Sequence, residues 1–348
     1  MPADTVLRRR AALTTVSVVA GALALGGCAE PAADPRTAPA STATPAGDAA
    51  TPSASPSDGA EASASASASA SPSSSVSASA SAKGSASAAP SGGTPTAAPA
   101  HPVAGAQALS ADGTFTGLAF DTCTAPPLAT MTAWRGTSPY GAAAVYIGGR
   151  NRGCAQPQLT ASWVAAVGAG GWRLIPLYVG AQPPCQTGSS PEKITAATAD
   201  SLGAADGADA VAKASALGMK PGSTLYLDVE AYNAADAACG DAVLAYTQSF
   251  DRAVKARSYR PGFYGFAGSS AAGIAKAAGQ GAPDLPDALW YAKYDGAADT
   301  TGGFPYAADL FTGHRRAHQY QVNQKETYGG AALTVDRNAW DAPVAVTG

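Results

Sequence analysis

The sequence predicts an α/β fold, a TIM-like (β/α)8 barrel in standard or modified form, preceded by a long disordered tether. Strand-like and helix-like segments alternate through the last 240 or so residues, and a barrel of this type takes about 250. Polar residues recur where the strand-like segments end, and only a closed barrel brings the first and last strands together around one pocket. A doubly wound open sheet is the alternative, because it shares the same alternation.

Residues 1–27 predict a signal peptide of the lipoprotein type. Three arginines, Arg8, Arg9 and Arg10, precede an apolar stretch that is too short for a comfortable transmembrane helix. The following Leu-Gly-Gly-Cys resembles a bacterial lipobox, which implies cleavage before Cys28 and a lipid on its sulfur. An ordinary signal peptide is the alternative, and the arginines also permit twin-arginine export. The expected location is the outer face of the cytoplasmic membrane, in the cell envelope.

Residues 28–108 predict the tether that joins this anchor to the folded domain. After the cysteine, the segment consists almost entirely of Ala, Ser, Pro, Thr and Gly. Such a composition buries too little apolar surface to offset the entropy of ordering the chain. We therefore expect an extended disordered linker, with an O-glycosylated stalk as an alternative, and one folded domain over residues 109–348.

Eight segments of this domain are predicted to be strands, because apolar and aromatic residues run through each one. They are residues 114–122, 142–149, 172–180, 224–232, 260–266, 288–296, 317–323 and 333–340. Helices are predicted between several of them. Residues 157–171 repeat apolar side chains at i, i+4 and i+8 and end in glycine. An alanine-rich segment ends near Leu217, and residues 241–258 are amphipathic.

The fourth predicted strand, residues 224–232, carries two acids on one face. Aliphatic residues alternate there with Tyr226, Asp228 and Glu230. The aliphatic face would contact the helices, and both acids would point into the barrel mouth, roughly 7 Å apart at Cα. Two crowded acids at low dielectric do not both ionise easily, so we expect one proton donor and one carboxylate, as in glycoside hydrolysis. A purely structural role in hydrogen bonds or a salt bridge is the alternative.

Further candidate site residues lie at other strand ends. Asp121 and Asp336 would add two acids to the same pocket. Four aromatic residues have the amphipathic rings that stack on sugar faces, although packing in the core is the alternative for each. They are Tyr146, Tyr178, Tyr264 and Trp290.

The four cysteines of the predicted domain favour two disulfides, since an even number in an exported domain is typical of disulfide pairing. Each follows one of the first four predicted strands, so all four would lie in loops on one rim. Neighbouring loops meet the geometric requirement best, which favours Cys123–Cys154 and Cys185–Cys239 over the crossed and nested pairings. Four free thiols are the alternative.

Several classes of function find no support in the sequence. Histidines number three, no cysteine pair has zinc-ligand spacing, and we expect neither a metal nor a cofactor. The chain lacks a nucleophile elbow, a dinucleotide-binding loop and a phosphate loop. Its formal net charge of -3 offers no basic patch for nucleic acid. We expect a monomer.

Five segments together resemble a known family. They are "GTFTGLAFDTC", "GADAVAKASALGMKPGSTLYLDVEAY", "RPGFYGF", "LWYAKYDG" and "AHQYQ…TVDRNAW". The set resembles the glycoside-hydrolase-like domain first catalogued in actinobacteria as a domain of unknown function. That domain is similar in outline to the glycoside hydrolase family 25 lysozymes. The resemblance covers about residues 112–346 and implies a modified barrel, export to the envelope and a pocket of acids.

The resemblance also assigns expected roles to individual residues. Asp228 and Glu230 match the Asp-x-Glu of the fourth strand, in which the glutamate is the proton donor. The remaining matches are the first-strand acid, the sixth-strand tryptophan, a seventh-strand Gln-Tyr pair and an acid near the eighth strand. These are Asp121, Trp290, Gln319, Tyr320 and Asp336. Where the lysozymes open with Gly-x-Asp-Val-Ser, this chain has "LAFDTCTAPP".

The sequence thus leads to the hypothesis of a retaining-type glycosidase acting on N-acetylated, peptidoglycan-like cell-wall glycan. Glu230 would protonate the leaving oxygen, and Asp228 would stabilise positive charge. Asp121 and Asp336 would hold the substrate. A non-catalytic glycan-binding lipoprotein and a purely structural envelope protein are the alternatives. The expected partners are cell-wall polysaccharide and, through the lipid anchor, the membrane.

Overall fold

A computed structural model of the chain describes residues 113–348. The predictions made for residues 1–27 and 28–108, including lipidation of Cys28 and the disordered tether, lie outside the described residues. Within residues 113–348, no helix has the length and apolarity needed to cross a membrane.

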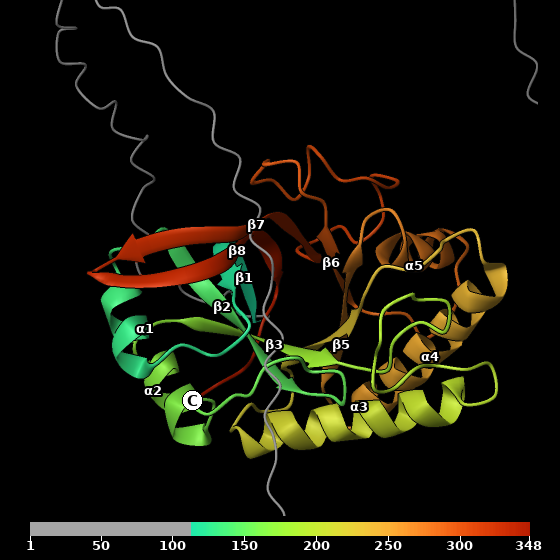
Figure 1. The fold of residues 1–348 in the computed structure, drawn as a ribbon, viewed down its shortest axis with the longest axis horizontal. Coiled ribbons are helices and arrows are strands. Elements are labelled where there is room, and N and C mark those ends of the chain that lie inside the picture. The colour runs from blue at the N-terminus through green and yellow to red at the C-terminus, as the bar shows by residue number, and fades with distance from the viewer. Residues whose placement is uncertain (1–112) are drawn as a thin grey trace, which may run out of the picture. The chain divides into compact units, whose positions relative to one another are not determined.

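Eight strands close into a barrel in the order in which they occur along the chain (Figure 1). This confirms the predicted α/β barrel and the position of every predicted strand. The strands are β1 (Thr114–Asp121), β2 (Tyr140–Gly148), β3 (Arg173–Val179), β4 (Thr224–Val229), β5 (Arg260–Phe266), β6 (Ala288–Ala292), β7 (Arg316–Tyr328) and β8 (Ala331–Pro343).

Five helices follow the first five strands, one after each. They are α1 (Leu128–Trp134), α2 (Ala161–Ala169), α3 (Ala199–Ala216), α4 (Ala237–Lys255) and α5 (Ser270–Gly279). Side-chain caps fix the starts of two of them. The Thr160 side chain accepts a hydrogen bond from the Trp163 amide at the beginning of α2, and the Asp236 side chain accepts one from the Cys239 amide at the beginning of α4. In the described part of the chain, no helix follows β6, and β7 joins β8 directly.

The last two strands depart from a standard (β/α)8 barrel. Strands β1 to β7 pair in parallel, but β8 is antiparallel to both of its neighbours, β7 and β1. The cause is the two-residue turn Gly329-Gly330, because so short a connection joins only antiparallel strands. Both glycines have positive φ, 56° and 79°, as the favoured hairpin turn requires. The hairpin extends past the barrel and lies over α1, where the Trp134 indole donates to the Ala331 carbonyl at 2.9 Å (Figure 1).

Side-chain alternation along the strands divides the core into two layers. Leu225, Leu227 and Val229 are fully buried between the barrel wall and the helices, as their alternation predicts. On the other face of β4, Tyr226 lies inside the barrel. Its ring centroid is 6.1 Å from that of Trp290 and 5.3 Å from that of Trp340. These aromatic side chains fill the interior, so the barrel is closed beneath its mouth and offers a site only at the ends of the strands.

Both predicted disulfides are present. Cys123–Cys154 joins the loops after β1 and β2, with 5.8 Å between Cα atoms. Cys185–Cys239 joins the loop after β3 to the first turn of α4, with 5.9 Å between Cα atoms. The bonds therefore tie together loops at the end of the barrel where β1 to β4 finish.

Candidate functional site

The end of β4 places two acids at the barrel mouth, as predicted. Asp228 faces the interior and is 3% exposed, whereas Glu230, just past the strand, is half-buried. Both acids line a cavity of about 310 Å³. Tyr146 of β2 and the Cys123–Cys154 disulfide also line it. The cavity is therefore bounded on one side by a covalently fixed loop.

Two further acids reach the same mouth from the β1–β8 edge. Asp121, at the end of β1, is 2% exposed, and Asp336 of β8 is its direct partner in the sheet register. The reversed direction of β8 produces this pairing, because Asp336 then lies at the same end of the barrel as Asp121.

The Tyr146 hydroxyl lies close enough to all four acids to be affected by their charges. Burial raises the pKa of the Tyr146 hydroxyl well above its ordinary value. The negative charges of the four acids, Asp121, Asp228, Asp336 and Glu230, raise it further. The structure therefore brings together all four of the carboxyl groups that the sequence singled out.

Asp121 is held by two amides. Its Oδ2 accepts hydrogen bonds from Gln319 Nε2 at 3.0 Å and from Asn338 Nδ2 at 2.7 Å. Burial raises the pKa of Asp121 to about 7, and the charge of Asp336 adds to this effect, whereas the two amide donors oppose it. Asp121 consequently exchanges a proton near neutral pH.

The amides are themselves fixed by aromatic side chains. Gln319 Oε1 accepts from the Tyr264 hydroxyl at 2.8 Å and from the Tyr294 hydroxyl at 3.2 Å. Asn338 Oδ1 accepts from the Trp290 indole at 2.8 Å. These bonds fix both amide orientations, so that Gln319 and Asn338 each present an N–H group to the carboxylate.

The two acids at the end of β4 are too poorly solvated to be fully ionised at the same time. Burial raises the pKa of Asp228 well above its ordinary value, and the charges of Glu230 and Asp121 add to the rise. One of its oxygens, Oδ1, is buried without a hydrogen-bond partner in residues 113–348. Burial also raises the pKa values of Glu230 and of Asp336. The four acids therefore retain protons that isolated carboxyl groups would lose, and they titrate as a coupled set.

Gln182, to which the sequence assigned no role, clamps the two acids of β4 through their backbone. Its Nε2 donates to the carbonyls of Asp228 at 3.0 Å and Gly180 at 3.1 Å, and its Oε1 accepts from the Glu230 amide at 2.9 Å. The side chain is 1% exposed. A single amide thus fixes the backbone on both sides of Val229, and with it the directions of both acids.

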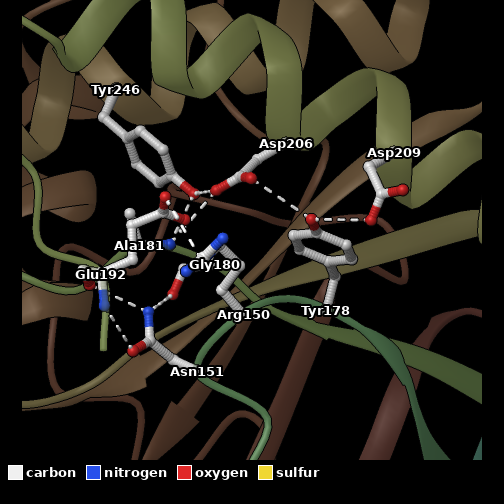
Figure 2. Close-up of polar contacts among 9 residues, drawn as sticks. All are labelled: Arg150, Asn151, Tyr178, Gly180, Ala181, Glu192, Asp206, Asp209 and Tyr246. Atoms are coloured by element: carbon white, nitrogen blue, oxygen red, sulfur yellow. Dashed lines mark hydrogen bonds and ion pairs between the residues drawn. The ribbon is translucent and has the colours of Figure 1, made fainter. Parts of the chain in front are cut away.

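Tyr178 does not line the cavity, so that prediction is wrong. It points away from the barrel interior to α3, where its hydroxyl donates to Asp206 at 3.2 Å and to Asp209 at 3.0 Å (Figure 2). The physical reason is strand alternation, because Ile175 and Leu177 of β3 occupy the interior and Tyr178 must face outward.

The Tyr178 side of β3 supports the clamp from behind. Tyr246 of α4 donates to Asp206 at 2.5 Å, and the Ala181 amide contacts both side chains (Figure 2). Gly180 allows this approach, since a Cβ atom there would lie 2.2 Å from the Tyr246 oxygen. The corner that leads into Gln182 is therefore fixed by buried hydrogen bonds.

The remaining predicted aromatic residues differ in their access to the cavity. Tyr146 reaches it directly. Tyr264 is 6% exposed and holds Gln319, whereas Trp290 is fully buried and cannot stack on a ligand. Tyr320 lies on the outer face of β7 beside His318, so its prediction as a substrate-binding residue is wrong for the same reason of alternation. Tyr294, to which we gave no role, is 51% exposed and presents an aromatic face next to the acids.

Within residues 113–348, no group of three or more His, Cys, Asp or Glu side chains is arranged to hold a metal ion. The chemistry that the site offers is that of carboxyl groups: proton transfer and stabilisation of positive charge.

A modified β/α barrel with this set of acids at its mouth is a glycoside-hydrolase-like architecture. Residues 132–340, more than half of the chain, match the family described as the Rv2525c-like, glycoside hydrolase-like domain. The chain belongs to this family. Among curated proteins, none matches the chain.

The fold is similar to several solved structures. The Mycobacterium tuberculosis Tat-secreted protein Rv2525c is 14% identical with a TM-score of 0.44, and the match covers 65% of this chain and 96% of that one. An uncharacterized Bacillus stearothermophilus protein is 16% identical with a TM-score of 0.43, over 64% and 95%. The modular autolysin LytC from Streptococcus pneumoniae is 13% identical with a TM-score of 0.43, over 65% and 46%.

Proposed function

We propose that this chain is a retaining-type glycosidase of the cell envelope that cleaves N-acetylated, peptidoglycan-like wall glycan. One observation carries the proposal: four carboxyl groups with raised pKa values meet at one barrel mouth, two of them from a single strand. Acids whose environments hold protons near neutral pH are what glycoside hydrolysis requires.

Glu230 is the proposed general acid. It is half-buried and lines the cavity, so its carboxyl group is accessible to a leaving-group oxygen. Burial raises its pKa, which favours the protonated form that a general acid needs. Glu230 would give its proton to the glycosidic oxygen as the bond from C1 to that oxygen breaks.

Asp228 is the proposed stabilising carboxyl group. Asp228 lines the cavity, and its carboxyl group can accept a hydrogen bond from the N–H of a substrate acetamido group. The acetamido oxygen then attacks C1 as the leaving group departs, and Asp228 in its ionised form offsets the positive charge that develops. Water later opens the cyclic intermediate, with Glu230 acting as the base that takes its proton, so the configuration at C1 is retained.

Asp121 and Asp336 are proposed to hold the substrate and to set the number of protons in the acid cluster. Tyr146 and Tyr294 are the proposed sugar-contacting rings, since both are accessible beside the acids. Tyr264, Gln319 and Trp290 act behind them, through the hydrogen bonds that orient Asp121.

Two disulfides support the proposed location, because such bonds persist in oxidising compartments outside the cytoplasm. A lipid on Cys28 would anchor the protein to the outer face of the cytoplasmic membrane. The tether would then let the domain reach wall polysaccharide at a distance from the membrane.

Binding of wall glycan without hydrolysis is the second candidate. Asp228 is 3% exposed, so little of it can touch a bound sugar. This burial favours binding without hydrolysis, because a catalytic carboxyl group must contact the substrate.

Digestion of purified peptidoglycan by the full exported protein separates the two candidates. Release of new reducing ends, lost in Glu230→Gln and kept in the exposed-acid control Asp309→Asn, supports the glycosidase. Glycan binding by the wild type without any new reducing ends supports the second candidate and refutes the first.

A further inference from the structure

A second cavity lies between α4 and α5, close in sequence to the acids. Its volume is about 430 Å³, compared with about 310 Å³ at the acid cluster. Tyr232, two residues after Glu230, lines it together with the start of α4. A volume of this size lies within the roughly 300–1,000 Å³ typical of ligand pockets. The loop that carries the proposed general acid therefore also forms one wall of this cavity.

Small residues leave the space between the two helices unfilled at this point. Gly240 of α4 and Gly273 of α5 face the gap, and the Tyr232 hydroxyl reaches between them. A Cβ atom at position 273 would lie 3.1 Å from that hydroxyl oxygen. Glycine inside a helix makes the helix less stable than alanine would. Alanine at these two positions would place methyl groups in the space that the glycines leave open.

Polar groups of several kinds converge on the cavity. Ser269, in its wall, is 7% exposed, and its hydroxyl has no hydrogen-bond partner within the described residues. Asp241 on α4 and Lys276 on α5 supply charges of opposite sign. No ion pair between them occurs in residues 113–348. Both charges are therefore available to a ligand that spans the gap.

We propose that this cavity binds a short peptide with small side chains, of the kind carried by wall glycan. The N-terminus of such a peptide is joined to the glycan as an amide, so its charged groups are a side-chain ammonium group and carboxylates. Charges of opposite sign on the two helices suit that pair. The hydroxyls of Tyr232 and Ser269 suit the amide groups of the peptide, and Val243 and Ile274 suit its methyl groups.

The inference rests on the proposed function for the source of the peptide, and it deepens that function. Because one loop carries both Glu230 and Tyr232, a glycan strand at the acids and its attached peptide at α4 and α5 can be bound together. The preferred substrate is then glycan that carries peptides rather than bare glycan.

Calorimetric titration of the full-length protein tests the inference without requiring hydrolysis. The probes are a tetrapeptide of alanine and lysine with an acetylated N-terminus and a free C-terminus, and an N-acetylated disaccharide without peptide. We expect saturable binding of the tetrapeptide, weakened about fivefold by Asp241→Asn and by Lys276→Gln. Gly240→Leu should abolish it by filling the cavity, because Gly240 lines the cavity and the nearest atom to a Cβ there, the Tyr232 hydroxyl oxygen, is 3.7 Å away.

Matched controls separate this site from the acid cluster. Lys213→Gln, an exposed lysine on α3, and Glu230→Gln should both leave tetrapeptide binding unchanged. The absence of saturable tetrapeptide binding at millimolar concentration would overturn the inference, as would unaltered binding by Gly240→Leu or disaccharide binding that Gly240→Leu removes. Peptide binding without glycan cleavage would support the inference and count against the glycosidase. Glycan cleavage without peptide binding would support the glycosidase and count against the inference.

Discussion

The side-chain amide of Gln182 should be essential to the geometry of the two acids on β4. The substitution Gln182→Leu keeps a similar volume but removes the side-chain partner of two buried backbone groups, the Asp228 carbonyl and the Glu230 amide. The Gly180 carbonyl keeps its hydrogen bond from Asn151 Nδ2 at 2.8 Å. The backbone on both sides of Val229 would then be free to shift, and both carboxyl groups with it.

The size of the effect follows from the two backbone groups that lose the Gln182 side chain as a partner. Each unsatisfied buried group costs roughly 1–3 kcal/mol, and groups in one network do not add fully. We therefore expect the free energy of unfolding to fall by about 3 kcal/mol. For a domain of roughly 150–250 residues, each kcal/mol changes the melting temperature by about 2–4 °C, so Tm should fall by roughly 6–12 °C. A displacement near 1 Å at the acids can lower kcat by about 10²-fold.

Thermal unfolding followed by circular dichroism measures the first effect, and glycan cleavage by folded protein measures the second. Gln248→Leu is the matched control, because the Gln248 side chain donates an exposed hydrogen bond to the Pro283 carbonyl. Its loss should lower the free energy of unfolding by less than about 1 kcal/mol. Gln182→Glu keeps the acceptor for the Glu230 amide, so its Tm should lie between those of the wild type and Gln182→Leu. Equal Tm values for Gln182→Leu and wild type would refute the clamp.

Three further predictions concern buried acids and the disulfides. Neither carboxyl oxygen of buried Asp251 has a hydrogen-bond partner in the described residues, and burial raises its pKa well above the ordinary value. The folded state therefore holds a proton that the unfolded state loses, and stability falls as pH rises above about 3.9, by up to about 1.4 kcal/mol per pH unit. Asp251→Asn should remove this loss, so urea unfolding should show a gain that grows from pH 4 to pH 7; a constant difference would contradict it. Glycan cleavage should decline as pH rises through about 7, the pKa of Asp121, and a rate that keeps rising there would count against a proton-sharing cluster. Replacing Cys185 and Cys239 together by alanine opens a loop with a separation of 54 residues, which should cost about 4 kcal/mol in chemical denaturation, and an unchanged midpoint would be inconsistent with a stabilising bond.

Local patterns in the sequence were sufficient for the strand order and the disulfides. Alternation in β4 correctly separated Asp228 and Glu230 from the aliphatic face. The cysteine pairs followed from their positions after successive strands, because neighbouring loops of a barrel meet at one rim.

The direction of β8 depends on a short turn between the last two strands. Gly329-Gly330 between two strand-like segments is a hairpin turn signal, and it predicts the antiparallel strand that brings Asp336 beside Asp121. Short helices α1 and α5 were not predicted, since α1 spans under two turns and α5 is rich in alanine and glycine.

The sides of β3 and the roles of the amides could not be read from the sequence. Apart from its first residue, Arg173, β3 is buried along its whole length, so no polar alternation shows that Tyr178 faces outward. Gln182, Gln319 and Asn338 act through contacts with residues distant in the chain, and an isolated amide in a sequence carries no pattern that reveals such contacts.

General-acid catalysis by Glu230 is the central claim, and comparing two leaving groups tests it most directly. The rates of wild type and Glu230→Gln are measured on wall glycan, whose leaving group must be protonated, and on an aryl glycoside, whose phenolate leaves without a proton. The account predicts a loss of about 10²–10⁴-fold on glycan and a far smaller loss on the aryl glycoside. Equal losses on both substrates, or a mutant that cleaves glycan at the wild-type rate, would contradict the assignment of Glu230 as the proton donor.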